Sequence, residues 1–284
     1  MLAAAVLLAA CSTDRAAVAP EPSTTSTTPT VTATSTTTTS TTTSAVTTTS
    51  TLPRWVLGAT PLPLRPDGFG EVLATPEALV RRELPTTDLL PPPPDEVFRS
   101  SVAAVDPATR NRMGETWQEG CPVPIEDLRR VTVSHWGFDG EVHTGELVLH
   151  RDVAEDVVGV FARLHDLRFP IEQLRITTTA DLDAHPTGDG NGSGAFGCRP
   201  VRGGSRWSQH SFGTAVDINP FQNPFQRGDL VLPELASAYL DRTDVRPGMI
   251  LPGDQVVAAF AAIGWHWGGE WTEPDHMHFS RDGG

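Results

Sequence analysis

The sequence predicts an α+β domain in which helices flank a small, mainly antiparallel sheet, preceded by a disordered tether. Short β-strand patterns alternate with two strong helix patterns between residues 98 and 284. The 25 prolines and 25 glycines leave much of the remaining chain as loops. Residues 12–52 consist almost entirely of Ser, Thr, Ala and Pro, so they bury too little apolar surface to offset the entropy of ordering them.

The N-terminus has the composition of a secretion signal. Residues 1–10 read MLAAAVLLAA and Cys11 follows, which resembles a bacterial lipoprotein signal that ends at its lipidated cysteine. The resemblance implies a lipid anchor on Cys11 and an extracytoplasmic protein, either attached to the cell membrane or secreted; a chance cysteine is the alternative. Because a positively charged start and a length of about 15–30 residues are missing, we expect the signal to begin upstream of Met1.

Two cysteines remain once Cys11 is set aside. In an extracytoplasmic protein, Cys121 and Cys198 are expected to be oxidised to a disulfide. Two buried free thiols are the alternative. A zinc site on this pair is less favoured, because a better set of ligands lies elsewhere in the chain.

Composition divides the chain into four segments. They are a signal with its cysteine at residues 1–11, a Ser/Thr-rich linker at 12–52, a Pro-rich extension at 53–97 and a compact domain at 98–284. Within the extension, Thr75-Pro76 has the pattern of a helix N-cap followed by proline at the first helical position. We expect the extension either to wrap the domain or to act as a semi-rigid spacer.

Hydrophobic spacing predicts the elements of the compact domain. Residues 152–167 have the 3.6-residue period of a helix, and Asp152 with Glu155 forms a variant of the capping box. A second helix is predicted at 254–263 and ends at Gly264. Strands are predicted at residues 131–133, 146–150, 174–179, 214–219 and 277–280.

Charge and composition exclude several classes of protein. The formal net charge is −14, and all 21 basic residues are arginine. Such a chain offers no basic surface for nucleic-acid phosphates and no polybasic segment for an anionic membrane. Because no apolar run reaches 18 residues, we expect no transmembrane helix and no membrane attachment besides the lipid anchor. We also expect a monomer.

Two C-terminal segments carry the chemistry. The first, residues 207–220, reads WSQHSFGTAVDINP and places His210 and Asp217 seven positions apart. An aspartate buried without a partner in the strand TAVDIN would be costly, so a cation beside it is favoured. Backbone hydrogen bonds or an arginine would satisfy the same carboxylate.

The second segment, residues 264–279, reads GWHWGGEWTEPDHMHF and contains three of the nine histidines. His276 and His278 share one face of a predicted strand, so either could join the first segment. Two imidazoles and a carboxylate bind Zn²⁺ with one position left for water, which is the pattern of a hydrolytic site. The candidates for the base that such a site needs are Asp275, Glu270 and Glu273.

The order and spacing of these residues resemble a family of zinc peptidases. The patterns S-x-H-x-x-G-x-A-x-D-I, W-G-G-x-W and D-x-M-H-F resemble those of D-alanyl-D-alanine carboxypeptidases and L-alanyl-D-glutamate endopeptidases, which cut peptidoglycan stem peptides. The resemblance covers about residues 115–284. It implies a hedgehog/D-Ala-D-Ala-peptidase-like fold, a Zn²⁺ cofactor and the peptidoglycan stem peptide as substrate, and it leaves open which of the two bonds is cut.

The same resemblance implies a role for each site residue. The zinc ligands are His210, Asp217 and His278, and Asp275 is the catalytic base. His276 falls at a position that the family pattern leaves free. The arginine that stabilises the oxyanion corresponds best to Arg199 in the phrase FGCRP; the rival candidates are Arg202 and Arg206, and a surface ion pair is the alternative role. Ser208 is expected to orient the site through a hydrogen bond.

Two other functions fit a zinc site. A cell-wall binding module without turnover would lack the base or the arginine, and candidates for both are present here. A structural zinc domain is less favoured, because structural sites have four protein ligands and are usually rich in cysteine.

Overall fold

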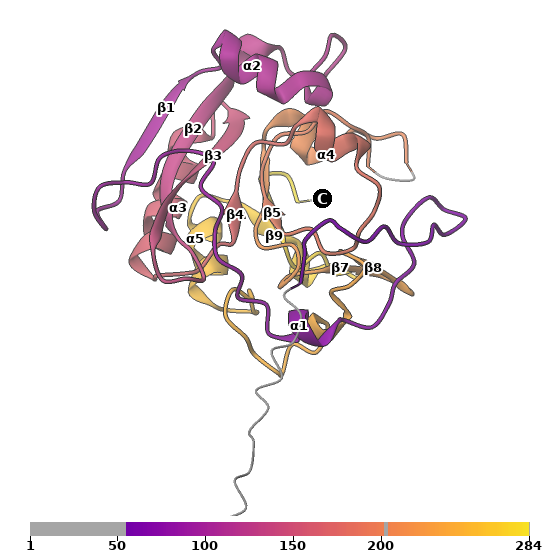
Figure 1. Ribbon diagram of the computed structural model, residues 1–284. Coiled ribbons are helices and arrows are strands. Elements are labelled where there is room, and N and C mark those ends of the chain that lie inside the picture. Colours follow the sequence, from indigo (N-terminus) through magenta and orange to yellow (C-terminus); the bar gives the residue numbers. More distant parts are fainter. Residues whose placement is uncertain (1–54, 202–203, 284) are drawn as a thin grey trace, which may run out of the picture. The chain divides into compact units, whose positions relative to one another are not determined.

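The computed structural model describes residues 55–201 and 204–283, and this part of the chain has the predicted α+β fold (Figure 1). The predicted signal at 1–11 and linker at 12–52 lie outside the described residues. The α-helices are α1 (Glu77–Val80), α2 (Pro107–Met113), α3 (Ala154–Asp166), α4 (Thr179–Asp183) and α5 (Gln255–Ala262). The strands are β1 (Ser100–Ala104), β2 (Leu128–Trp136), β3 (Val142–His150), β4 (Gln173–Leu174), β5 (Gly192–Ser193), β6 (Ala215–Asp217), β7 (Phe225–Arg227), β8 (Leu230–Leu232), β9 (His266–Trp267) and β10 (His278–Ser280). None of the helices in the described ranges has the length and apolar character needed to cross a membrane.

One three-stranded sheet is antiparallel and has the order β1-β2-β3. The helix α3 packs on it, and its Phe161 and Leu164 are buried in one cluster with Val131 of β2. Glycine is required at position 145 of β3, because a Cβ there would lie 2.5 Å from the side chain of Leu174. The sheet thus forms one side of the hydrophobic core.

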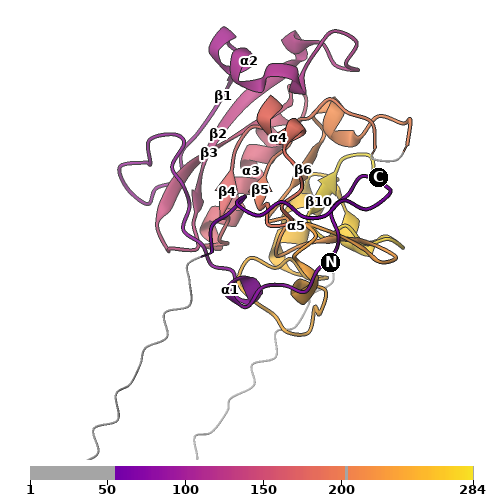
Figure 2. The same ribbon diagram turned by 45° about the vertical axis from the view of Figure 1, so that its right-hand side comes forward.

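A second antiparallel sheet has the order β6-β10-β9, and it carries both candidate segments. Figure 2 shows α5 beside β6 and β10. The ring of Phe260 on α5 stacks on Phe279 of β10 with ring centroids 3.9 Å apart. Both rings belong to the same core cluster as α3, so this core supports the strands that position the site. Two further pairs complete the sheets, the parallel β4-β5 and the antiparallel β7-β8.

Both predicted N-caps and one predicted strand need correction. The N-cap of α3 is Val153, which has no side-chain capping bond among the described residues, and the Asp152 carboxylate instead contacts His150 Nδ1 at 3.5 Å and Arg151 Nε at 3.6 Å. Pro76 is the N-cap of α1, while the hydroxyl of Thr75 donates to the carbonyl of Leu235 at 2.6 Å.

The predicted strand at 174–179 pairs only at Leu174, in β4. The chain then turns into α4, because Thr178 and Asp181 form a capping box that begins a helix. The guanidinium of Arg175 also binds the Asp181 carboxylate, at 2.5 and 2.8 Å. These local polar contacts end the strand early.

Residues 55–97 lie along the rest of the described chain in both views (Figures 1 and 2). Leu62 and Leu79 are buried in a second hydrophobic cluster together with Phe221. Arg82, which is 1% exposed, binds the carboxylate of Glu172 through two nitrogens at 2.7 and 2.8 Å. The segment is therefore joined to the domain by buried apolar and charged contacts.

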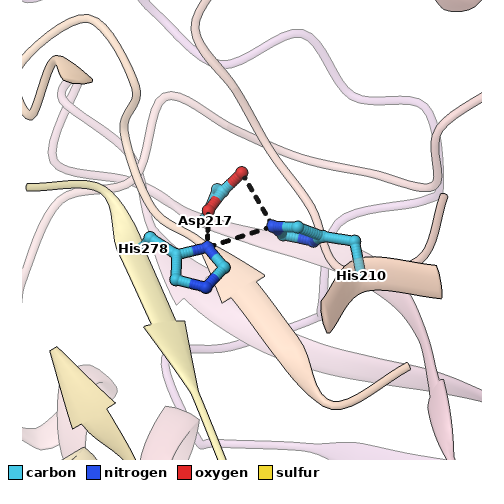
Figure 3. Close-up of side chains that lie close together, drawn as sticks. All are labelled: His210, Asp217 and His278. Carbon is cyan, nitrogen blue, oxygen red and sulfur yellow. Dashed lines mark hydrogen bonds and ion pairs between the residues drawn. The ribbon is translucent and has the colours of Figure 1, made fainter. Parts of the chain in front are cut away.

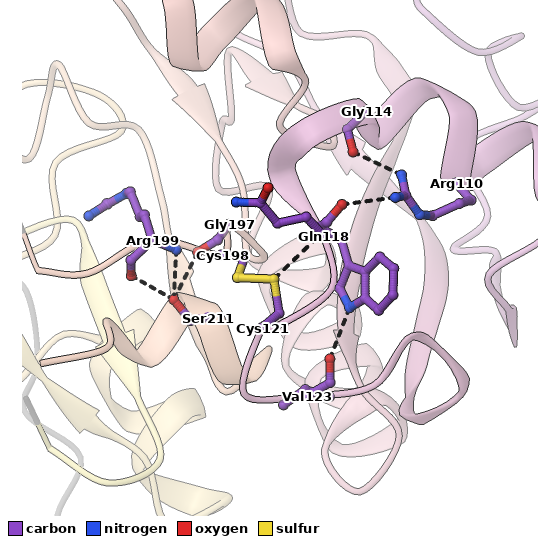
Figure 4. The surroundings of a disulfide bond; sticks show 10 residues. Arg110, Gly114, Gln118, Cys121, Val123, Gly197, Cys198, Arg199 and Ser211 are labelled. Carbon is purple, nitrogen blue, oxygen red and sulfur yellow. Dashed lines mark hydrogen bonds between the residues drawn. A yellow bond between two sulfur atoms is a disulfide. The ribbon is translucent and has the colours of Figure 1, made fainter.

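Cys121 and Cys198 form a disulfide, which confirms the predicted pair (Figure 4). The two cysteines are 77 residues apart in the sequence. Next to the bridge, the backbone N–H of Cys198 donates to the carbonyl of Thr116 at 2.9 Å. The bridge and this hydrogen bond hold the chain immediately before Arg199.

Candidate metal centre

His210 lies in a short 3₁₀ helix, Gln209–Phe212. Ser208 precedes this helix, and its hydroxyl accepts the backbone N–H of His210 at 3.3 Å. Gly213 ends the helix with φ +68°, and a Cβ there would lie 2.6 Å from the backbone nitrogen of His150, so only glycine fits. The Nδ1–H of His210 donates to the carbonyl of Ala195, which leaves Nε2 as the atom able to bind a cation.

Asp217 and His278 face each other across two paired strands. Asp217 ends β6, His278 begins β10, and the strand register places them directly opposite. The distance from His278 Nδ1 to Asp217 Oδ1 is 3.0 Å. The pairing of β6 with β10 thus brings together two residues that are 61 positions apart in the sequence.

The three side chains converge on one point (Figure 3). His210 Nε2 lies 3.2 Å from His278 Nδ1 and 3.2 Å from Asp217 Oδ2. Ligand atoms at about 2.0–2.1 Å from a tetrahedral zinc ion lie roughly 3.3 Å from one another, so these atoms have the spacing of zinc ligands. The residues present therefore fit a zinc ion, with one position left for water or substrate.

The protonation states also suit a cation. Burial raises the pKa of Asp217, but His210 and His278 outweigh burial and hold this pKa well below its ordinary range. Burial lowers the pKa of His278, and the charge of Asp217 opposes this effect only in part. These shifts favour the carboxylate form of Asp217 and the neutral form of the His278 imidazole, which are the forms that bind metals.

Asp275 lies in the loop before β10 and lines the same cleft as the three ligand candidates. Its backbone N–H donates to the carbonyl of Gly268 at 2.9 Å, and its own carbonyl accepts the N–H of His278 at 3.1 Å. Its Oδ1 is buried without a hydrogen-bond partner among the described residues. Burial and the charge of Asp217 raise the pKa of Asp275 well above its ordinary value, although Arg199 partly opposes them.

The backbone of Arg199 is fixed by a buried serine (Figure 4). The Arg199 N–H donates to Ser211 Oγ at 2.9 Å, and Ser211 Oγ lies 2.7 Å from the Arg199 carbonyl. Ser208 donates its N–H to the same carbonyl at 3.1 Å. Because Arg199 lines the cleft and lowers the pKa of Asp275 and of His278, its charge acts at the site.

The remaining candidates for the base, the arginine and the histidine ligand differ in whether they line the cleft. Arg206 and Glu273 line the cleft, whereas Glu270 is exposed and is not among the cleft residues. Arg202 lies outside the described residues. The ring of His276 packs on Trp267, with centroids 5.7 Å apart, and it is not part of the cluster of ligand candidates.

The cleft has a volume of about 1020 Å³, a size suited to a peptide of several residues. Its walls include parts of the chain that the sequence did not indicate: residues 184–188, the β7–β8 hairpin and Phe69 of the extension. No local pattern marks these residues, because they reach the cleft only through tertiary packing. The indole of Trp271, from the motif W-G-G-x-W, lies 5.3 Å from the His278 ring, measured between centroids.

Comparison with known proteins agrees with the motif-based resemblance. Residues 202–281 match the model of a protein family described as D-alanyl-D-alanine carboxypeptidase. This match includes the three ligand candidates and Asp275, but it begins at residue 202 and so does not include Arg199. Searches of curated proteins and of solved structures found no match. Over residues 202–281 the chain is thus similar to a peptidase family.

Proposed function

We propose that this chain is a zinc-dependent peptidase that hydrolyses a bond in the peptidoglycan stem peptide, acting as a D-alanyl-D-alanine carboxypeptidase or an L-alanyl-D-glutamate endopeptidase. The observation that carries the proposal is the convergence of His210, Asp217 and His278 beside a buried carboxylate in one cleft. The family match over residues 202–281 supports the peptidase class.

The residues around the ligand candidates suit peptide hydrolysis. Zinc held by the three side chains would supply a Lewis acid that polarises the scissile carbonyl and lowers the pKa of water. Asp275, with its raised pKa, would accept a proton from the attacking water and donate it to the leaving amine. The guanidinium of Arg199 would stabilise the negative charge that develops on the carbonyl oxygen.

We further propose that the protein acts outside the cytoplasm, anchored through Cys11 or secreted. The Cys121–Cys198 disulfide supports this location, because such bonds persist in oxidising compartments. A linker at residues 12–52 would let a lipid-anchored domain reach cell-wall material some distance from the membrane.

A zinc-containing binding module without turnover is the alternative function. Such a module needs no acid–base group, so the buried Asp275 and the nearby Arg199 would have no role in it. Their presence in the cleft favours the enzyme.

Product analysis tests the proposal. The full-length protein, loaded with zinc, is incubated with a stem pentapeptide, and the products are identified by mass spectrometry. Release of terminal D-Ala identifies a carboxypeptidase, and a cut between L-Ala and D-Glu identifies an endopeptidase. The His210→Ala variant is the control and is expected to lose both zinc and turnover. Zinc binding and peptide retention without any product would support the binding module instead.

A further inference from the structure

Residues 62–71 of the extension form a loop that closes one part of the cleft. An antiparallel bridge between Leu64 and Gly70 holds the base of the loop. On one side, the N–H of Leu62 donates to the carbonyl of Pro186 at 2.8 Å. On the other side, the loop is joined to the β7–β8 hairpin and to Glu234 by hydrogen bonds.

Two polar contacts fasten the loop on that second side. The guanidinium of Arg65 binds the carboxylate of Asp229, at the turn of the hairpin, at 3.1 and 3.3 Å. The N–H of Gly70 donates to Glu234 Oε1 at 2.9 Å. Packing is close here, because a Cβ at Gly70 would lie 2.9 Å from Leu62 Cδ1 and 3.0 Å from Glu234 Oε1. These contacts therefore hold residues 62–71 in place as part of the cleft wall.

Glu234 is a buried carboxylate that lines the cleft. The residue is 6% exposed, and the N–H of Gly70 satisfies only its Oε1. Its Oε2 takes part in no hydrogen bond or ion pair within residues 55–201 and 204–283, and it is not among the fully buried side-chain atoms that lack a partner, so it keeps some access to solvent. A carboxylate removed from water gains most from a cationic partner, through a charge-assisted hydrogen bond.

Two apolar residues that are close in sequence to Gly70 and Glu234 also line the cleft. Phe69, which is 8% exposed, and Leu232 of β8 line the same cleft. Leu232 pairs with Phe225 in the β7–β8 hairpin, and Phe225 in turn forms a bridge with Asp275. This apolar wall is thus connected through one hairpin to the proposed base, and it offers contacts for methylene groups.

We propose that Glu234, Phe69 and Leu232 form a substrate subsite for a residue whose long aliphatic side chain ends in an ammonium group, as in a diamino acid. The methylene groups pack on Phe69 and Leu232, and the ammonium group binds Glu234. The subsite rests on the proposed function, since it assigns a substrate residue to the cleft that holds the candidate metal centre. It gives the extension a role in selecting the substrate.

Binding measurements test the subsite separately from turnover. The zinc-loaded, full-length protein is titrated calorimetrically, in an Asp275→Asn background that spares the peptide, with a stem pentapeptide whose third residue is lysine. The same peptide with an Nε-acetylated lysine is the comparison ligand. We expect the free amine to bind at least about tenfold more tightly than the acetylated form.

Glu234→Gln is expected to abolish this preference, because glutamine retains an acceptor for the Gly70 N–H but carries no charge. Phe69→Ala is expected to weaken both peptides alike. Glu71→Gln is the matched control, since Glu71 is an exposed carboxylate of the same loop that does not line the cleft. It should keep the full preference.

The outcomes separate the two proposals. Equal affinity for the two peptides, no binding of either, or a preference that persists in Glu234→Gln would overturn the subsite. Turnover is assayed on the otherwise unchanged protein. Absence of product there contradicts the proposed function, while an amine preference that depends on Glu234 would still support the subsite.

Discussion

Asp275 combines a raised pKa with a buried carboxylate oxygen that has no hydrogen-bond partner in the described part of the chain, which is the environment of a general acid–base. Asp275→Asn preserves the size of the side chain but cannot accept a proton. We expect kcat to fall by about 10²–10⁴ while zinc stays bound, because the three ligand candidates are unchanged. Steady-state kinetics and elemental analysis of the purified variant check both parts, and a near-native rate would contradict the assigned role.

Arg199 and Arg206 both line the cleft, so substitution has to decide between them. We expect Arg199→Ala to lower kcat by about 10²–10³, the usual cost of removing one oxyanion-stabilising group, with zinc retained. Arg206→Ala is the matched control and is expected to have a much smaller effect on kcat. A larger loss in Arg206→Ala than in Arg199→Ala would transfer the role to Arg206.

The site residues that could be predicted from the sequence are those that lie in short motifs rich in metal-binding side chains. His210 and Asp217 were recognisable because both lie in one short segment, and His278 because histidines cluster near the C-terminus. Glu234 and Phe69 were not predicted. They come from distant parts of the chain that no spacing rule connects, and only the packing of residues 62–71 brings them into the cleft.

Among the elements, the 3₁₀ helix Gly268–Glu270 sets the position of Asp275. A Cβ at Gly268 would lie 2.6 Å from the Asp275 carbonyl oxygen and 3.1 Å from its Cβ. We expect Gly268→Ala to displace Asp275 and lower kcat by about tenfold or more, because small errors in the placement of catalytic groups are costly. Turnover and zinc content are the measurements.

The matched control is Gly159→Ala on α3, where a Cβ would meet no described atom within 4 Å apart from its chain neighbours and the backbone of its own helix. It should retain activity and gain about 0.5–1 kcal/mol of stability from the higher helix propensity of alanine. Unchanged kcat in Gly268→Ala would show that the loop tolerates the side chain and that Gly268 does not position the base.

The β2–β3 pair contains two histidines that lie opposite each other, His135 and His143. Burial lowers the pKa of His135 to about 4. Two carboxylates, Asp88 and Asp139, contact His143 at 2.9 and 3.1 Å and raise its pKa although burial opposes them. The two rings thus have opposite effects on how stability depends on pH.

The His135 contribution has a definite sign. Below pH 6.5 the unfolded chain protonates this histidine, whereas the folded chain does so only near pH 4. The contribution of His135 to the free energy of unfolding therefore falls by about 3 kcal/mol as the pH decreases between these values. Urea unfolding at several pH values should show a shallower decrease for His135→Leu. His266→Leu, at an exposed site, is the control and should retain the original slope.

For the whole molecule, the fold class was predictable because two helix patterns and several short strand patterns mark it in the sequence. The ends of elements were less predictable, since Asp152 and Thr75 bond outside the helices that they precede. The packing of residues 55–97 could not be derived either. It depends on pairs such as Arg82 with Glu172, whose partners are 90 positions apart.

The Cys121–Cys198 disulfide links global stability to the site, because Cys198 immediately precedes Arg199. In the chain-entropy model, a bridge between cysteines 77 residues apart contributes at most about 4.5 kcal/mol. We expect the Cys121→Ser/Cys198→Ser double variant to lose a large part of this free energy of unfolding. We also expect a lower kcat, since the chain before Arg199 then loses its covalent link and keeps noncovalent contacts such as the packing of Phe196 and the hydrogen bond from Cys198 N–H to the Thr116 carbonyl.

Zinc binding should be nearly unaffected in this variant, because His210, Asp217 and His278 are held by backbone pairing and by the Ala195 carbonyl rather than by the bridge. Urea unfolding, zinc content and kcat, each measured well below the unfolding midpoint, separate these effects. A fall in stability with unchanged kcat would assign the bridge to the fold alone. Loss of zinc together with kcat would show that the bridge supports the whole site and not specifically Arg199.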